Sequence, residues 1–313
     1  MFFGGGTPSL VPGDQLGSIV EAIPRHDHAE VTVECNPDTV SAELFSAYRK
    51  SGVTRISFGV QSMVDRVLLS LGRSHDTENV KRGVELARSA GFSSFNLDLI
   101  YGGAGESLAD WESTIRAVIA LEPPHISAYA LTIESGTPLA ADVARHPDDD
   151  DQADKYELAE ELFTAAGYAN YEISNWAKPG HQCQHNLLYW RGGDYRGFGC
   201  AAHSYTAHAD GSSRRWWNHR TPERYIEAAF ADQLTETAGE DLDAPTAALE
   251  RLQLLLRTST GVDDSSFAPE DLAEFDAANL TSRNAEDRVV LTVSGRLMAN
   301  TVLIKLRPGP SPF

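Results

Sequence analysis

The chain has 313 residues, and its 45 acidic against 26 basic side chains give a formal net charge of −19. We expect no non-specific binding to nucleic acid, because such binding needs a basic face, although one local basic pocket is compatible with this composition. No apolar run approaches the ~20 residues that span a bilayer, and no export signal opens the chain, so the expected compartment is the cytoplasm.

The chain opens with two aromatic residues, three glycines and Thr-Pro-Ser, over Met1–Ser9. This pattern predicts a buried strand that ends in a loop whose backbone comes very close to another group, since glycine has no Cβ and tolerates positive φ. Because proteins seldom begin in the middle of a core strand, the segment suggests that something has been cut off before Met1.

Short apolar runs alternate with helical periodicity up to about residue 170, which predicts a parallel sheet. Beside the opening strand, we expect strands at Val31–Val33, Arg55–Phe58, Phe95–Ile100 and His125–Tyr129. We expect helices at Ser41–Lys50, Val64–Leu71, Asp76–Ala90, Ser107–Leu121 and Asp154–Ala166. An acidic run at 148–151 leads into the last helix and indicates a solvated helix start. Five strands in this pattern fit a barrel or partial barrel, whose sites gather at the carboxyl ends of the strands.

Beyond about residue 170, the alternation of strands and helices ends. A region rich in glycine, histidine and aromatic residues covers 180–217, and from about residue 221 we expect polar helices. A short strand at Arg288–Leu291 and a threonine-capped helix at about Thr292–Leu306 indicate a small helical or winged-helix-like domain. The predicted fold is therefore α/β, with a partial barrel at 1–170, a region that closes it at 171–230, and a C-terminal domain at 231–313.

Polar residues recur where the predicted strands end, namely Glu34, Gln61 and Asp98. A carboxylate within a buried strand is costly unless it is paired or hydrogen-bonded. Each carboxylate alone could be a satisfied core residue, but together they share one rim of the barrel. Arg73 follows Gln61 by twelve residues. It is either a surface arginine or a residue whose planar guanidinium binds a ligand carboxylate.

A second group of residues begins at His185 and includes Tyr189 and Trp190. If this segment is helical, His185 and Tyr189 lie on one face at positions i and i+4. Histidine is a common axial ligand of haem iron, and aromatic rings cover porphyrin faces. The alternative is a helix that packs its aromatic rings under the barrel with a hydrogen-bonded histidine, and residue types alone favour that alternative.

The first group resembles the radical S-adenosylmethionine (SAM) enzymes, and among them the oxygen-independent coproporphyrinogen III oxidase family. The matching segments are FFGGGTPSL, TVECNPDTV, GVTRISFGVQS, LGRSH, FNLDLIYG and PPHISAYALTIESGTPL, in family order over most of residues 1–140. The resemblance implies a partial (β/α)₆ barrel that binds SAM. The residues that it implies for the SAM region, with a second SAM site left open, are Gly5, Gly6, Thr7, Glu34, Gln61, Arg73, Asp98 and Ala130.

The family's cluster loop, CxxxCxxC, does not occur in the 313 residues. Cys35, Cys183 and Cys200 are scattered and match neither this loop nor a CxxC pair, so they predict no disulfide framework and no cluster site. We therefore expect a 4Fe–4S cluster only in a full-length protein. The hypothesis is a truncated gene model that also lacks the first barrel strand.

The second group, His185-Asn186-x-x-Tyr189-Trp190, resembles the HNxxYW signature of the HemW-type haem chaperone branch. The segments RRWWNHRTPERY and RVVLTVSGRLMANTVLIKL resemble that branch as well. The resemblance implies haem bound by these four residues, with His185 as the iron ligand. His181 and His203 are nearby alternatives, and Cys183 and Cys200 are weaker ones.

The resemblance implies a haem chaperone that delivers haem to respiratory haem proteins, with a cluster that controls dimerisation and transfer in place of substrate oxidation. The alternative is an enzyme, oxygen-independent coproporphyrinogen III oxidase, which converts two propionates to vinyl groups with SAM-derived radicals. The intact HNxxYW motif argues against the enzyme, and no catalytic residue is assigned. A non-functional fragment is a third interpretation. The sequence leaves open whether the protein forms a homodimer and whether it contacts a membrane peripherally.

Overall fold

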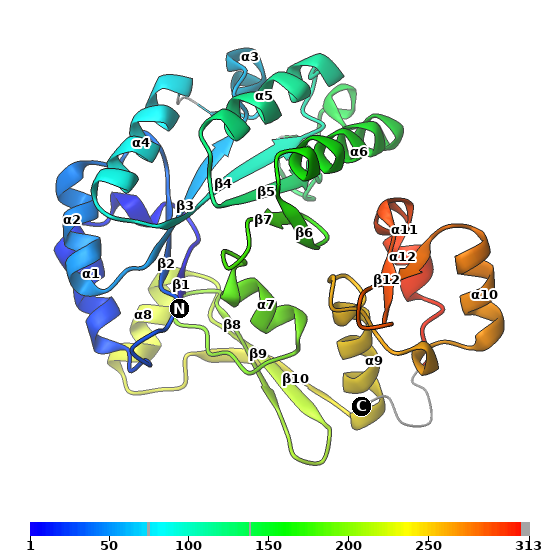
Figure 1. The fold of residues 1–313 in the computed structure, drawn as a ribbon. Coiled ribbons are helices and arrows are strands. Elements are labelled where there is room, and N and C mark those ends of the chain that lie inside the picture. Colours follow the sequence, from blue (N-terminus) through cyan, green and yellow to red (C-terminus); the bar gives the residue numbers. More distant parts are fainter. Residues whose placement is uncertain (74–75, 138, 308–313) are drawn as a thin grey trace. The chain divides into compact units, whose positions relative to one another are not determined.

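A computed structural model describes residues 1–73, 76–137 and 139–307 (Figure 1). The chain divides into two compact units, Met1–His185 and Asn186–Phe313. Each unit is described by itself below. The boundaries predicted at residues 170 and 230 stay predictions.

The first unit contains a seven-stranded sheet with the order β1-β2-β3-β4-β5-β7-β6. Neighbouring strands from β1 to β5 are parallel, whereas β7 pairs antiparallel with both β5 and β6. All five strands expected from the sequence are confirmed. The strands are β1 (Phe2–Phe3), β2 (Thr32–Cys35), β3 (Arg55–Gln61), β4 (Ser94–Tyr101), β5 (His125–Ala130), β6 (Ala169–Glu172) and β7 (Asn175–Ala177).

Helices connect the parallel strands and lie along the outer side of the sheet (Figure 1). Ser41 caps α2 by accepting a hydrogen bond from the backbone N–H of Leu44, and Ser107 and Asp110 form a capping box at the start of α5. The helices are η1 (Pro8–Leu10), α1 (Gly13–Ala22), α2 (Ala42–Ser51), α3 (Asp65–Ser70), α4 (Thr77–Ser89), α5 (Leu108–Ala120), η2 (Val143–Arg145) and α6 (Asp149–Ala165).

The acidic run at 148–151 forms the start of α6, so this helix begins five residues before the predicted Asp154. The side chain of Asp148 caps the helix by accepting from the backbone N–H of Asp151. Carboxylates in a first turn are favoured by the partial positive charge of the helix N-terminus. The predicted helix start at the acidic run is confirmed, and only the predicted boundary at Asp154 lies too late in the chain.

The second unit contains a three-stranded antiparallel sheet, a two-stranded hairpin and several short helices. The predicted strand at Arg288–Leu291 is confirmed as β12. The elements are α7 (Gln184–Trp190, which begins in the first unit), β8 (His203–Ala207), β9 (Ser213–Asn218), α8 (Pro222–Phe230), β10 (Glu236–Leu242), α9 (Ala244–Leu255), η3 (Asp264–Ser266), α10 (Pro269–Ala277), β11 (Thr281–Arg283), β12 (Val289–Leu291), α11 (Val293–Leu297) and α12 (Ala299–Leu303).

Two predictions for this unit were wrong in detail. The polar segment expected to be helical from residue 221 includes strand β10, whose Glu236 and Glu240 form ion pairs with Arg214 and Arg215 of β9. Such cross-strand pairs stabilise a strand that its own sequence does not favour. The threonine-capped helix is confirmed at Thr292 but is broken at Met298, where the backbone leaves helical geometry between α11 and α12.

In the part of the chain that the structure describes, we find no helix that is long and apolar enough to cross a membrane.

Candidate functional site

The strands of the first unit have one apolar face and one polar face. Phe58 of β3 is fully buried and packs edge-on against Phe45 of α2, so its face of the sheet is the one that the helices cover. Because strand side chains alternate, Arg55 and Ser57 point to the opposite face, which we call the inner face. Polar side chains collect there.

The strand register aligns these polar residues into a row. Glu34 of β2 pairs with Ser57, Ser57 pairs with Asn96 of β4, and Asn96 pairs with His125 of β5. Asp98 lies one step further along the inner face, beside Ser127. Four consecutive parallel strands therefore place hydrogen-bonding side chains at neighbouring heights.

Asp98 is held by hydrogen bonds within this row. Its carboxylate accepts from the Ser57 hydroxyl at 2.7 Å and from the Asn96 amide at 2.6 Å. Burial raises the pKa of Asp98, and these hydrogen bonds oppose that rise. Asp98 is thus a satisfied carboxylate on the inner face, three residues before β4 ends at Tyr101, and its place in the SAM region stays a prediction.

Glu34 lies against the glycine loop that follows β1. Its carboxylate accepts from the backbone N–H of Gly5 at 3.2 Å, and a methyl group on Gly4 would come within 3.0 Å of the same carboxylate. Burial and the nearby Asp98 raise the pKa of Glu34, and the hydrogen bond from Gly5 opposes that rise.

Gly5 and Gly6 adopt positive φ angles of 80° and 61°. A methyl group on either would meet no heavy atom within 4 Å, so open space borders the backbone. Thr7 follows at the N-cap of η1. The close approach predicted for this loop is confirmed at Gly4 and Glu34.

Gln61 has a strained backbone at the end of β3. Its φ is 67°, its side chain is 8% exposed, and a bulge interrupts the pairing with β4 between Gly59 and Gln61. A left-handed conformation is costly for a residue with a Cβ and persists where the surroundings enforce it, often at functional sites. The bulge gives Gln61 a geometry that the strand alternation alone does not predict.

Arg73 and Ala130 are the other two residues predicted for the SAM region. Arg73 is exposed and follows the end of α3, where its backbone N–H donates to the carbonyl of Leu68 at 2.9 Å. Ala130 ends β5 and pairs with Tyr101 of β4. Ser74 and His75 of the LGRSH segment, and Pro138 of the last matching segment, lie outside the described residues.

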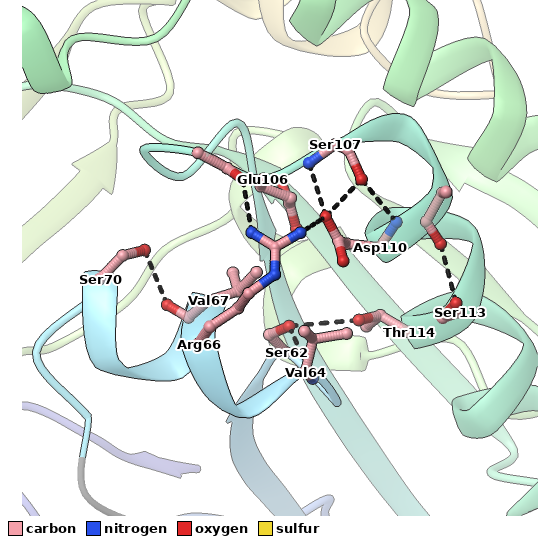
Figure 2. Close-up of polar contacts among 12 residues, drawn as sticks. Ser62, Val64, Arg66, Val67, Ser70, Glu106, Ser107, Asp110, Ser113 and Thr114 are labelled. Atoms are coloured by element: carbon pink, nitrogen blue, oxygen red, sulfur yellow. Dashed lines mark hydrogen bonds and ion pairs between the residues drawn. The ribbon is translucent and has the colours of Figure 1, made fainter.

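An ion pair and a hydrogen bond join helix α3 to helix α5 and to the loop between β4 and α5. Figure 2 shows Arg66 of α3 in an ion pair with Asp110 of α5. The Arg66 guanidinium also donates to the carbonyl of Gly105 at 2.7 Å. Nearby, the hydroxyls of Ser62 and Thr114 are 3.2 Å apart. The segment that leads from Gln61 towards Arg73 is therefore tied to the loop after β4. The spacing of Ser107 and Asp110 predicts a helix cap, but no local pattern predicts the contact with Arg66.

His185 is held by residues from the start of the chain. Its imidazole stacks on the ring of Phe2, with centroids 4.6 Å and planes 19° apart, and its backbone N–H donates to the Glu30 carboxylate at 3.2 Å. Burial, with smaller effects of nearby positive charges, lowers the pKa of His185 to about 4. The imidazole is therefore neutral at physiological pH, which is the form that coordinates a metal.

The other residues of the HNxxYW motif lie on α7 within the second unit. Tyr189 packs edge-on against Tyr195 at 4.4 Å, and helix α7 is confirmed over Gln184–Trp190, including Asn186 and Trp190. Of the two alternative histidines, His181 contacts Ser94 in the first unit and His203 stacks on Trp217 in the second.

The cysteines do not form a cluster site. Cys35 and Cys183 are buried and Cys200 is exposed, all three as free thiols. Among the described residues, no group of three or more histidines, cysteines and carboxylates has the geometry to hold a metal ion. The residues present therefore do not fit a 4Fe–4S cluster.

Comparison with known proteins identifies the class of protein. The family profile of the radical SAM superfamily matches residues 1–118. The fold is similar to that of coproporphyrinogen III oxidase (HemN) from Escherichia coli, a radical SAM enzyme, with a TM-score of 0.81 over 97% of this chain and 76% of that one. The two sequences are 21% identical, so this likeness shows the fold. The predicted α/β fold with a mostly parallel sheet is confirmed, and residues 1–118 form a radical SAM-type domain.

Curated relatives identify the family within that class. The heme chaperone HemW of Mycobacterium tuberculosis (strain H37Rv) is 39% identical over 97% of this chain and 79% of its own length. The HemW proteins of Escherichia coli (K12) and Bacillus subtilis (168) are 42% and 33% identical, over 77% and 96% of this chain and 65% and 83% of theirs. This chain belongs to the HemW heme chaperone family, as the HNxxYW motif predicts.

Proposed function

We propose that this chain is a haem chaperone that binds haem through His185. The observation that carries the proposal is the position of His185, whose imidazole is kept neutral and stacks on the ring of Phe2, and whose backbone N–H donates to the carboxylate of Glu30. A neutral, oriented imidazole is ready to coordinate haem iron without first losing a proton. Membership of a family whose named members are heme chaperones supports the same function.

The aromatic residues of the motif supply the rest of the proposed haem site. Tyr189 and Trp190 offer flat apolar surface of the kind that covers a porphyrin, and Asn186 offers an amide for a polar edge. Haem is the cargo in this proposal, to be released to respiratory haem proteins. The homodimer, the peripheral membrane contact and the cytoplasmic location expected from the sequence stay predictions.

SAM is the proposed ligand of the inner face. Glu34 and Asp98 would hold its cationic groups, while the backbone of Gly5 and Gly6, the side chain of Thr7 and the rim residues Gln61, Arg73 and Ala130 would surround the rest. The raised pKa of Glu34, beside the open space at Gly5 and Gly6, supports this assignment, since a nearby cation would stabilise the charged carboxylate. The described residues do not fit a 4Fe–4S cluster, and a cluster is proposed only for the full-length protein.

A haem titration tests the proposed function. The purified chain is titrated with haem while the Soret band is followed, in parallel with the His185→Ala, His181→Ala and His203→Ala variants. We expect saturation near one haem per chain, with a weakened and shifted band in His185→Ala and little change in the other two. A folded wild-type chain that gives no saturable Soret change would contradict the proposal and favour the oxidase alternative, which is tested by SAM-dependent decarboxylation of coproporphyrinogen III.

A further inference from the structure

A continuous chain of buried hydrogen bonds joins Asp98 to the segment that carries His185. From Asp98 it passes to Asn96 at 2.6 Å, from Asn96 Oδ1 to His125 Nδ1 at 2.6 Å, and from His125 Nε2 to the Tyr171 hydroxyl at 2.7 Å. The Tyr171 oxygen in turn accepts from the backbone N–H of Cys183 at 3.2 Å. Asn96, His125, Tyr171 and Cys183 are all at most 2% exposed, so solvent does not interrupt this path.

The chemistry of the groups fixes the direction of every bond in this chain. The Asn96 amide nitrogen donates to Asp98 and Ser57, so its oxygen must accept from His125 Nδ1–H. Burial lowers the pKa of His125 well below its usual range, so the ring is neutral and its Nε2 accepts from the Tyr171 hydroxyl. The Tyr171 oxygen is then free to accept from Cys183. Each donor points towards Asp98, and such aligned bonds strengthen one another.

A second anchor holds the same segment from the other side. The Glu30 carboxylate accepts from the backbone N–H groups of Gln184 and His185, both at 3.2 Å, and from the Cys183 thiol at 3.6 Å. The two anchors share no residue other than Cys183, and they fix the backbone on either side of it. His185 is thus placed by side chains that come from β6 and from the loop before β2.

We infer that Tyr171, with His125 behind it, is a positioning residue for haem ligation by His185, and that Glu30 is its counterpart on the other side of the segment. The inference deepens the proposed function and rests on it. Residues that orient a metal ligand without touching the metal commonly change metal affinity when they are altered, by about 10-fold to 100-fold. Tyr171 acts here through the backbone of Cys183, two residues before the ligand.

The test compares two tyrosines that differ in what their hydroxyls hold. Tyr171→Phe removes the hydroxyl that binds Cys183 and His125, while the matched control Tyr168→Phe removes an equally buried hydroxyl that donates to the carbonyl of Pro123 at 2.7 Å. Haem affinity, the Soret maximum and the resonance Raman markers of the iron's coordination are measured for both. We expect about 10-fold weaker haem binding and altered coordination markers in Tyr171→Phe, and wild-type values in Tyr168→Phe.

A second variant pair covers the case in which Tyr171→Phe does not fold. Glu30→Gln replaces the carboxylate that holds Gln184 and His185, and Glu21→Gln on exposed α1 is its control. We expect altered coordination markers only in Glu30→Gln. Wild-type spectra and affinity in both folded anchor variants, alongside loss of haem in His185→Ala, would overturn the inference and leave the proposed function standing. A wild-type chain that binds no haem would instead remove the proposed function itself.

Discussion

The imidazole of His185 stacks on the ring of Phe2, with centroids 4.6 Å apart and an angle of 19° between the planes. Phe2 belongs to the two-residue strand β1, whose pairing with β2 is parallel. The segment that opens the chain therefore contributes to two proposed sites. Its aromatic end covers the proposed haem ligand, and its glycine end lies against Glu34 at the proposed SAM site. One short strand thus contributes to both sites.

Phe2→Ala is expected to raise the pKa of His185 from about 4 towards its usual value of 6.5, because water would reach the imidazole. The lost stacking should also lower the free energy of unfolding by about 1 kcal/mol. NMR titration of the imidazole protons and urea denaturation measure the two effects. Phe198→Ala, at a residue that is 67% exposed, is the control and should change neither. An unchanged His185 pKa in Phe2→Ala would mean that other neighbours bury the ring.

The affinity for haem bound through His185 should not change with pH in the range where a histidine usually takes up a proton. The affinity is expected to stay constant as the pH falls through 6.5 and to decline as the pH approaches 4, because only then does the imidazole take up a proton. Soret titrations at fixed pH steps measure this. A decline centred near 6.5 would contradict the burial of His185 or its role as ligand.

The same pKa shift has a consequence for stability. The folded state binds fewer protons at His185 than the unfolded state does between pH 6.5 and 4, so its contribution favours folding less as the pH falls through this window. His185→Gln should therefore show a weaker loss of stability in that window than the wild-type chain, measured by urea denaturation across pH. The matched control His208→Gln changes an exposed residue of the second unit and should leave the pH profile unaltered.

Gln61→Gly is expected to stabilise the chain while weakening SAM binding. Glycine adopts the φ of 67° found at this position without strain, so the free energy of unfolding should rise by about 1 kcal/mol. The amide side chain that we assign to the SAM region is lost at the same time. Thermal unfolding and calorimetric titration with SAM measure both effects. Gln61→Ala separates them, because it removes the amide and keeps the strain; equal stabilisation by both variants would argue against strain at Gln61.

Glu106→Gln should stabilise the chain above neutral pH. Burial raises the pKa of Glu106 to about 7, its Oε2 accepts from the backbone N–H of Gly102 at 2.7 Å, and among the described residues its buried Oε1 has no hydrogen-bond partner. A carboxyl group with a raised folded-state pKa contributes stability below its usual pKa of 4.5 and loses it as the pH rises through 7. Glutamine keeps the acceptor for Gly102 and carries no charge.

The expected gain for Glu106→Gln is on the order of 1–3 kcal/mol at pH 8, shrinking towards zero at pH 5. Urea denaturation at both values measures it. Glu112→Gln on the exposed side of α5 serves as the control, with no pH-dependent gain expected. A gain of equal size at both pH values would show that Glu106 is not protonated in the folded chain near neutrality.

The sequence by itself determined the five parallel strands and helices α2 to α6 of the first unit, and the family to which the chain belongs, but not α1, β6 or β7. Both depend on local signals: the serine cap before α2, the capping box at α5, and motifs such as His185-Asn186-x-x-Tyr189-Trp190, whose members lie within a few residues of each other. Local signals failed where distant residues decide the outcome. The charged strand β10 forms ion pairs with arginines of β9.

Only the tertiary structure decided how the candidate sites are built. It placed Glu30 against the backbone of His185, 155 residues away, and joined Asp98 to Cys183 through Asn96, His125 and Tyr171. No periodicity or spacing encodes such contacts, because strand register and chain reversal bring their partners together after the local elements have formed. The motif identifies His185 as the candidate ligand from the sequence. The neighbours that set the charge and orientation of His185 come together only when the chain has folded.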